Sequence, residues 1–248
     1  WAAFQNWIYQ DLHVTSQEKW LFTNDSSNAK LSQGSFDGWQ NLNKMTDKKT
    51  GQLLFPFLEK ELKEGSRLLI TGHSLGGNLA TVYASYLWQS FKKKQHTGTG
   101  INVITFAAPA AGNEAFAIDF DKKFPQSIRV ENEYDIVPKF PCSSRLSSLG
   151  GLFSDSLSAN NTMVGYKSIT VSLNKVFALL NTAMTMMEFT SGISAYTQTN
   201  GNGKQIQIPL SGKNTGTDII NWLNEAGYHH GIAQYAAYEK VPVVECVQ

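Results

Sequence analysis

Residues 67–91 read RLLITGHSLGGNLATVYASYLWQSF, and they carry the clearest signal of the fold class. Residues 67–71 form a short, mainly apolar run between two glycines, which predicts a strand buried on both faces. Apolar residues recur at helical spacing over 78–91, which predicts a helix. A tight turn at 72–76 joins the two. A buried strand that runs through such a turn into a helix is typical of an α/β domain with a parallel sheet.

The alternation of strands and helices continues along the chain. Residues 101–106 and 127–131 are predicted strands, and 115–123 is a predicted helix between them. Strands that alternate with helices indicate an α/β fold with a mainly parallel central sheet. We expect a single domain over residues 1–248, because no internal repeat and no linker divides the chain.

An insertion is expected at about residues 141–216, where Ser, Asn, Gly and Thr are frequent. It contains two strand-like pieces, 168–173 and 205–210, and an apolar helix-like segment, 176–189. A stretch this long that leaves the alternation is better explained as a cap-like segment packed on the domain than as a structureless loop. A short helix over 217–226 follows, and we expect it to end at the next glycine.

Charge and composition exclude several classes of protein. The 21 Lys and Arg residues against 20 Asp and Glu give a formal net charge of +1, which does not suit a nucleic-acid binder. The apolar segment 176–189 is interrupted by polar residues and is shorter than the roughly 18 residues of a membrane span, so no transmembrane helix is expected. Cys142 and Cys246 lack the paired spacing of a zinc site, and they either form one disulfide or are two buried thiols.

The turn at 72–76 has the pattern G-x-S-x-G, which predicts Ser74 as a nucleophile. A serine on a tight strand-to-helix turn projects its hydroxyl above the sheet, and the glycines two residues before and after it relieve the crowding of the turn. The backbone N–H of Leu75 is expected at the helix N-terminus, where the helix dipole stabilises an oxyanion. The alternative is a packing turn that happens to contain a serine.

A serine nucleophile needs a base and a group that orients the base. Three of the five histidines precede the serine or follow it too closely in sequence: His13, His73 and His96. His229 and His230 remain as candidates for the base. Asp135 follows the predicted strand 127–131 and precedes Pro138, which makes it the expected acid in the order serine, acid, histidine.

Four separated blocks occur in an order that is specific to one family. They are GHSLGG at 72–77, TFAAP with GN at 105–113, NEYDIVP at 132–138 and HGIAQY at 230–235. Together they resemble the class 3 lipases, the family of filamentous-fungal triacylglycerol lipases and their bacterial and plant relatives. The resemblance covers roughly residues 5–140 and 217–238. It implies an α/β-hydrolase fold with a mainly parallel central sheet, to which this chain adds the inserted cap-like segment.

The resemblance also implies a catalytic triad of Ser74, Asp135 and a C-terminal histidine, acting through an acyl-enzyme intermediate. His230 is favoured over His229, because Tyr235 stands a few residues after it, as a tyrosine does in the family. The implied substrate is an acylglycerol ester at an oil–water interface, and the chemistry requires no metal and no cofactor. The alternatives are a carboxylesterase or phospholipase that acts on other esters, or a hydrolase-like scaffold that binds without turnover. The oligomeric state is left open.

A lid is implied near the start of the chain. Phe4, Trp7, Ile8 and Leu12 share one face of a possible helix, which suits the amphipathic lid that covers the site in this family. An ordinary surface helix packed on the core is the alternative. The low charge indicates a secreted protein, and the resemblance to a family whose members are often secreted implies the same.

The chain departs from the family in two places. The family's second oxyanion donor comes from an Arg-Gly-Ser/Thr motif ahead of the lid, and neither this motif nor the earlier strands of the sheet occur in the 248 residues. We expect an upstream segment that carries them; the alternative is a degenerate member. The insertion is the second departure, and its apolar residues either wall an acyl-chain pocket or form the insertion's own core: Leu149, Leu152, Phe153, Val176, Phe177, Leu179, Leu180, Met184, Met186 and Met187.

Overall fold

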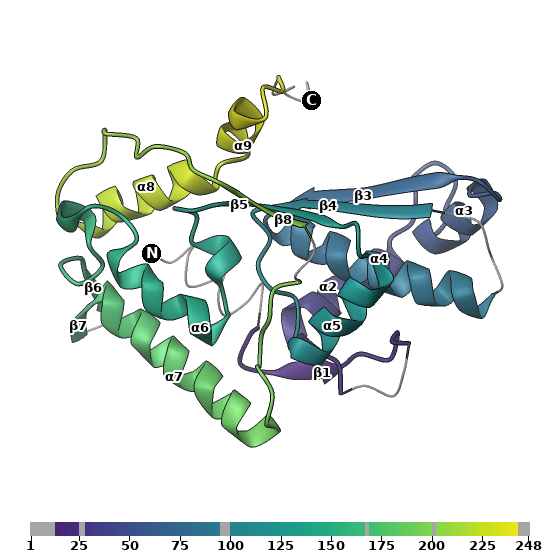
Figure 1. The fold of residues 1–248 in the computed structure, drawn as a ribbon, viewed down its shortest axis with the longest axis horizontal. Helices are drawn as coiled ribbons and strands as arrows, with labels where there is room; N and C mark the ends of the chain where they lie inside the picture. The colour runs from purple at the N-terminus through teal and green to yellow at the C-terminus, as the bar shows by residue number, and fades with distance from the viewer. Residues whose placement is uncertain (1–12, 25–27, 95–99, 167–168, 200–201, 243–248) are drawn as a thin grey trace.

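A four-stranded parallel sheet organises the fold (Figure 1). The computed structural model describes residues 13–24, 28–94, 100–166, 169–199 and 202–242. Within these residues the strand order is β3-β4-β5-β8, with β3 over Arg67–His73, β4 over Gly100–Phe106, β5 over Ile128–Asn132 and β8 over Asn202–Ile206. The predicted α/β fold with a mainly parallel sheet is therefore confirmed.

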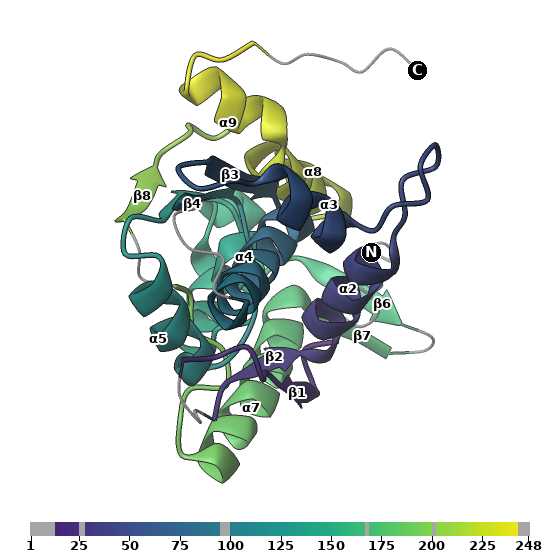
Figure 2. The ribbon, with the colours of Figure 1, turned by 90° about the vertical axis from the view of Figure 1, so that its right-hand side faces the viewer.

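Three helices cover one side of the sheet (Figures 1 and 2). They are α2 over Gln33–Lys44, α4 over Leu75–Lys93 and α5 over Glu114–Lys123. The apolar faces of α4 and α5 place Val82, Phe116 and Phe120 in one buried cluster with Val103 of β4. On the other side of the sheet, α9, over Ile232–Tyr238, packs Tyr235 against Val130 and Ile206.

The expected insertion begins after β5 and forms a mainly helical body, seen in green and teal at the left of Figure 1. Its core contains Leu149, Phe177 and Met184, which share a cluster with Ile136 and Val137 beside the sheet. A 3-10 turn, Val137–Lys139, precedes the insertion. The elements of the insertion are the 3-10 turns Ser147–Gly151 and Asp155–Leu157, the helices α6 (Ser143–Leu146) and α7 (Leu173–Ser191), and the antiparallel strands β6 (Met163–Tyr166) and β7 (Ile169–Ser172).

The structure differs from the sequence-based expectation at the end of this insertion. Of the piece expected at 205–210 within the insertion, only residues 205 and 206 are strand: they end β8, which pairs in parallel with β5 and so belongs to the central sheet. The helix expected over 217–226 is α8, over Ile219–His230, with the Asp218 side chain as its N-cap. Gly227 does not end it: this glycine lies inside the helix, where a side chain would meet open space. Packing of Trp222 and Ala226 against the insertion core stabilises the helix across this position.

The remaining elements lie toward the N-terminus. They are α3 over Leu54–Glu61 and the antiparallel pair β1 (Gln17–Lys19) and β2 (Lys30–Ser32). In the described part of the chain, the helices lack the combination of length and hydropathy that a membrane span requires.

Candidate active site

The turn between β3 and α4 holds Ser74 in a strained backbone conformation, with φ 58° and ψ −130°. Its N–H donates to the Phe106 carbonyl at 2.9 Å, which anchors the turn to β4. A Cβ on Gly72 would overlap the Gly76 carbonyl, and one on Gly77 would lie 2.8 Å from the Ala108 side chain. Gly76 itself faces open space, so the crowding that the motif relieves is at Gly72 and Gly77 and not at Gly76.

Ser74, His230 and Asp135 lie in hydrogen-bond contact. His230 is the last residue of α8, and its Nε2 lies 2.8 Å from Ser74 Oγ. Its Nδ1 lies 3.0 Å from Asp135 Oδ2. The Asp135 side chain is fully buried, whereas that of His230 is 24% exposed. The arrangement can transfer the serine proton to a ring nitrogen whose partner nitrogen is oriented by a carboxylate.

Neighbouring groups hold the turn that carries Asp135. The Val137 N–H donates to Asp135 Oδ1 at 2.9 Å. Arg145 donates to the Pro138 carbonyl at 2.9 Å and to the buried Glu131 carboxylate of β5 at 2.6 Å. The Asp135 side chain is therefore held by the Val137 N–H, and its turn is held by Arg145, which pairs with Glu131.

Tyr235 of α9 is a site residue whose contact with the acid the sequence did not reveal. Its hydroxyl donates to Asp135 Oδ2 at 2.7 Å and accepts the Asn132 N–H at 3.0 Å. Burial, and secondarily the charge of Asp135, raises the pKa of Tyr235, so the phenol stays protonated and remains a donor. The sequence carried one signal of this role, the spacing of the tyrosine after the histidine.

His73 also contacts His230. Its Nε2 lies 2.8 Å from the His230 carbonyl oxygen, and the two ring centroids are 4.8 Å apart. A carbonyl only accepts, so the Nε2–H of His73 is the donor. Burial, followed by the proximity of His230, lowers the pKa of His73, which favours the neutral ring.

A cavity of about 250 Å³ opens directly at Ser74. Its lining is mostly apolar: Ser74, Ile136, Val137, Leu223, Ala226, Gly227 and His230. Within the described residues, none of the ten apolar side chains of the insertion lines this cavity. Leu149, Phe177 and Met184 are buried in the insertion core, while Leu179 and Met186 are 71% and 63% exposed. The buried insertion residues thus belong to a core that they share with Ile136 and Val137, and the cavity is walled by α8 and the turn after β5.

The other sequence-predicted residues lie as follows. Leu75 is the first residue of α4, so its N–H is among those that the helix leaves without an internal partner. His229 points away from Ser74 into a buried network with Glu225. Cys142 is a buried free thiol whose pKa is raised to about 11 by burial. Five residues lie outside those that the structure describes: Phe4, Trp7, Ile8, Leu12 and Cys246.

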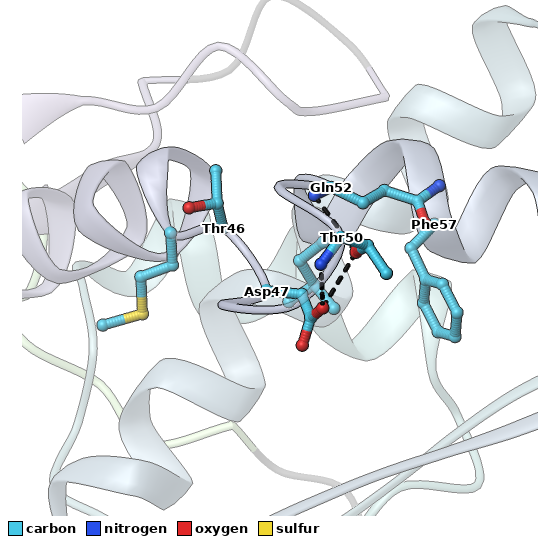
Figure 3. A pocket seen from close by; sticks show the side chains of 7 residues that line it. Thr46, Asp47, Thr50, Gln52 and Phe57 are labelled. Atoms are coloured by element: carbon cyan, nitrogen blue, oxygen red, sulfur yellow. Dashed lines mark hydrogen bonds between the residues drawn. The ribbon is translucent and has the colours of Figure 1, made fainter.

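A larger cavity, about 540 Å³, lies between the end of α2 and the start of α3 (Figure 3). Its carboxylate, Asp47, is occupied in its own turn, where it accepts hydrogen bonds from the Thr50 N–H and hydroxyl at 2.8 Å each. The Thr50 hydrogen bonds lower the pKa of this carboxyl. The residues that line it are Met45, Thr46, Asp47, Thr50, Gln52, Leu54 and Phe57.

The sheet, its helices and the turn at Ser74 define an α/β-hydrolase fold. The family model for class 3 lipases matches residues 4–144, more than half of the chain, and the chain belongs to this family. The crystal structure of M37 lipase superposes with a TM-score of 0.77 over 97% of this chain and 67% of that one, at 23% sequence identity. That likeness supports the fold.

Curated relatives match shorter segments. A Caenorhabditis elegans protein named as a lipase is 38% identical over 79 residues, which are 32% of this chain and 22% of that protein. The secreted mono- and diacylglycerol lipase 1 of Fusarium solani is 35% identical over 75 residues, 30% of this chain and 20% of that protein. Chloroplastic phospholipase A(1) DAD1 of Arabidopsis thaliana is 30% identical over 104 residues, 42% of this chain and 22% of that protein. The chain thus matches about a fifth of the length of each of these relatives.

Proposed function

We propose that this chain hydrolyses carboxylic ester bonds of lipids, with Ser74 as nucleophile, His230 as general base and Asp135 as the acid that orients it. The observation that carries the proposal is the 2.8 Å contact between Ser74 Oγ and His230 Nε2, with Asp135 3.0 Å from the other ring nitrogen. Membership of the class 3 lipase family supports the same reaction.

In the proposed acylation step, His230 Nε2 takes the proton of Ser74 Oγ while that oxygen attacks the ester carbonyl. Asp135 accepts the Nδ1–H and stabilises the imidazolium that forms. The Leu75 N–H donates to the oxyanion of the tetrahedral intermediate. As that intermediate collapses, the Nε2 proton passes to the departing alkoxide, which leaves as an alcohol and leaves the acyl group on Ser74.

In the proposed deacylation step, water attacks the acyl-enzyme. His230 Nε2 removes one proton from the water, and a second tetrahedral intermediate forms and collapses. The fatty acid leaves, and the proton returns from Nε2 to Ser74 Oγ. Each turnover thus consumes one ester and one water and yields one alcohol and one acid.

The apolar cavity supports a fatty acyl group as the acid part of the substrate. Its walls, Leu223, Ala226 and Gly227 on α8 and Ile136 and Val137 on the turn, offer apolar contacts next to the reacting serine. For the alcohol part we propose a glycerol ester. The Fusarium relative is named as a mono- and diacylglycerol lipase, while the Arabidopsis relative is named as a phospholipase, which makes a glycerophospholipid the second candidate.

The localisation and the lid are also proposals. We propose a secreted, single-domain enzyme that acts at an oil–water interface, with Phe4, Trp7, Ile8 and Leu12 on a lid. The name of the Fusarium relative supports secretion, and the name of the Arabidopsis relative points to a chloroplast instead. Val14, just after the proposed lid, packs in the same cluster as the cavity residues Ile136 and Val137, which supports a lid near the cavity.

Hydrolysis of p-nitrophenyl esters from short to long acyl chains, in solution and in emulsion, tests this function. We expect long chains to be preferred and turnover to rise at the interface. A serine-directed phosphonate should label Ser74 in the wild type and leave the Ser74→Ala variant unlabelled. Preference for short chains without interfacial activation would indicate a carboxylesterase. Faster turnover of phosphatidylcholine than of diacylglycerol would indicate a phospholipase, and folded protein without a Ser74 adduct would refute the mechanism.

A further inference from the structure

His229, the neighbour of the proposed base, belongs to a second buried network behind the site. Its side chain is fully buried, and its ring stacks on Phe153 with 5.8 Å between centroids. Nε2 lies 3.2 Å from Glu225 Oε1, one turn earlier on α8. Nδ1 lies 3.0 Å from the side-chain amide nitrogen of Asn132, the last residue of β5. Both ring nitrogens therefore have protein partners.

These partners fix the tautomer of His229. The amide nitrogen of Asn132 only donates, so Nδ1 accepts, and the Glu225 carboxylate only accepts, so Nε2 carries the proton. The orientation of the amide follows from Oδ1, which accepts the Ile208 N–H at 3.2 Å. Burial lowers the pKa of His229, and the Glu225 charge offsets this only in part, so the ring is held neutral.

Glu225 is itself held in place by the segment that follows β8. Its carboxylate accepts the Ser211 N–H and the Asn214 side-chain amide, each at 2.7 Å, and also the Ser211 hydroxyl. Burial alone would raise the pKa of Glu225, but the hydrogen bonds from Ser211 and Asn214 outweigh it, and the pKa lies below its usual value. The carboxylate is a fixed anion that can orient the His229 ring.

Asn132 connects this network to the acid and to the base. Its amide nitrogen also donates to the His229 carbonyl at 3.1 Å, next to His230 at the end of α8. Its backbone carbonyl accepts the Asp135 N–H at 3.0 Å. Its N–H donates at 3.0 Å to the Tyr235 hydroxyl, which donates to Asp135. One buried residue thus touches both the turn that carries the acid and the helix end that carries the base.

We propose that Asn132, His229 and Glu225 form a positioning network that holds His230 in register with Asp135 and Ser74. His229 is its key positioning residue, because its Nδ1 joins the Ile208 N–H and the His229 carbonyl in holding the Asn132 amide in one orientation. A reversed amide would place its NH₂ against the Ile208 N–H and its oxygen against the His229 carbonyl, and three hydrogen bonds would be lost together. The inference rests on the proposed function of the triad.

Two substitutions of His229 separate its two bonds. In His229→Asn the amide oxygen stands near the place of Nδ1 and can still accept from Asn132, while the bond to Glu225 is lost. In His229→Gln the amide nitrogen stands near the place of Nε2 and can still donate to Glu225, while the bond to Asn132 is lost. Both variants introduce an uncharged amide of similar polarity. Ser85→Ala is the matched control for stability, since Ser85 is buried and accepts the Trp20 N–H at 3.1 Å in another part of the core.

We expect His229→Gln to lower kcat by about 10- to 100-fold on a soluble ester with little change in KM, because a displacement of the base by about 1 Å costs that much. His229→Asn should retain kcat within about threefold. The melting temperatures of these variants and of Ser85→Ala show how far activity follows stability. Equal kcat losses in the two His229 variants, or an unchanged kcat in His229→Gln, would overturn the proposal.

A second measurement needs no turnover. The proton between His230 Nδ1 and Asp135 gives a downfield NMR resonance, which His230→Gln identifies by its disappearance. We expect this resonance to persist in His229→Asn and to shift or broaden in His229→Gln. If the wild type neither turns over esters nor reacts with the phosphonate, the proposed function fails and this resonance still decides the positioning role. The same resonance in both variants would refute that role.

Discussion

Two carboxylate–histidine pairs meet at the C-terminal end of α8, and they differ in what lies beyond the ring. Asp135 and His230 are 3.0 Å apart, and the far nitrogen of His230 reaches Ser74 Oγ at 2.8 Å on the edge of a cavity. Glu225 and His229 are 3.2 Å apart, and the far nitrogen of His229 meets the Asn132 amide in the interior. The first ring faces a group that can lose a proton, and the second faces one that cannot.

We infer that the role of each histidine depends more on the group at its far nitrogen, Ser74 Oγ or the Asn132 amide, than on the carboxylate that it pairs with. Successive residues of a helix point in different directions, so His229 and His230 enter different environments although they are adjacent in sequence. Nδ1 of His230 faces its carboxylate and Nε2 faces the hydroxyl, whereas Nε2 of His229 faces its carboxylate and Nδ1 faces the amide. We therefore expect proton transfer at His230 and positioning at His229.

The largest effect is expected when the ring of the first pair is replaced. His230→Gln removes the base, and kcat for a soluble ester should fall by about 10⁶-fold, as when the base of a comparable triad is removed. Phosphonate labelling of Ser74 should be lost as well, while circular dichroism should remain that of the wild type. A His230→Gln variant that keeps more than about a hundredth of the activity would contradict the role of His230 as the base.

The same chemical change in the two carboxylates should then have unequal effects. Asp135→Asn should lower kcat by about 10⁴-fold, because an amide in place of the carboxylate favours the wrong tautomer of the base. Glu225→Gln should lower kcat by no more than about tenfold. It should nevertheless destabilise the fold by about 1.5–3 kcal/mol, since hydrogen bonds to a charged carboxylate are lost. Steady-state kinetics and urea unfolding of both variants provide the test, and equal kcat losses would contradict the assignment of roles.

A smaller effect is expected on the cavity side of α8, where Gly227 lies one turn before the end of the helix. A side chain at this position meets open space, so Gly227→Leu should fold and should extend toward the cavity. We expect kcat/KM for long-chain esters to fall by about 10- to 100-fold, with little change for acetate esters. Gly227→Ala is the control. It should change chain-length preference little and should stabilise the helix by up to about 1 kcal/mol. An equal loss of kcat/KM for all acyl chain lengths in Gly227→Leu would show that this part of the cavity does not bind the acyl chain.

The strand, turn and helix around Ser74 could be predicted because their signals are local. An apolar strand, crowded glycines and an amphipathic helix occupy consecutive residues, and each expectation agrees with the next. The turn at Asp135 could be placed for a similar reason, since it closely follows a predicted strand. The choice between His229 and His230 rested on the resemblance alone, because the orientation of α8 depends on Trp222 and Ala226 packing against the insertion core.

The role of β8 illustrates the opposite case. Its sequence, NGKQI, contains a single strongly apolar residue, so nothing in its pattern indicates a strand of the central sheet. Ile206 is buried in one cluster with Tyr235 and Val130, and the strand pairs with β5 over five residues. Contacts with residues far away in sequence outweigh the weak local preference for a strand. The sequence-based prediction therefore placed these residues in the insertion and not in the central sheet.

The smallest predicted effect concerns the stability of the fold in mild acid, to which His229 should contribute. Burial lowers the pKa of His229 below 6.5, although Glu225 and, more weakly, Asp135 oppose this shift; Tyr134 and Tyr228 are the other titratable side chains against the ring. Below about pH 6.5 the unfolded chain therefore binds more protons than the folded one. The stability that His229 contributes is complete above that pH and is lost as the pH falls toward the folded pKa.

His73 titrates with the same sign, because burial also lowers its pKa. The His229→Asn variant should therefore retain part of the acid sensitivity, with a slope between about pH 5 and 6.5 that is smaller by no more than about 1.4 kcal/mol per pH unit. Urea unfolding of the wild type and His229→Asn at several pH values in this window measures the difference. Identical slopes would mean that His229 binds protons equally in the folded and unfolded states, which would contradict the lowered pKa of its buried ring.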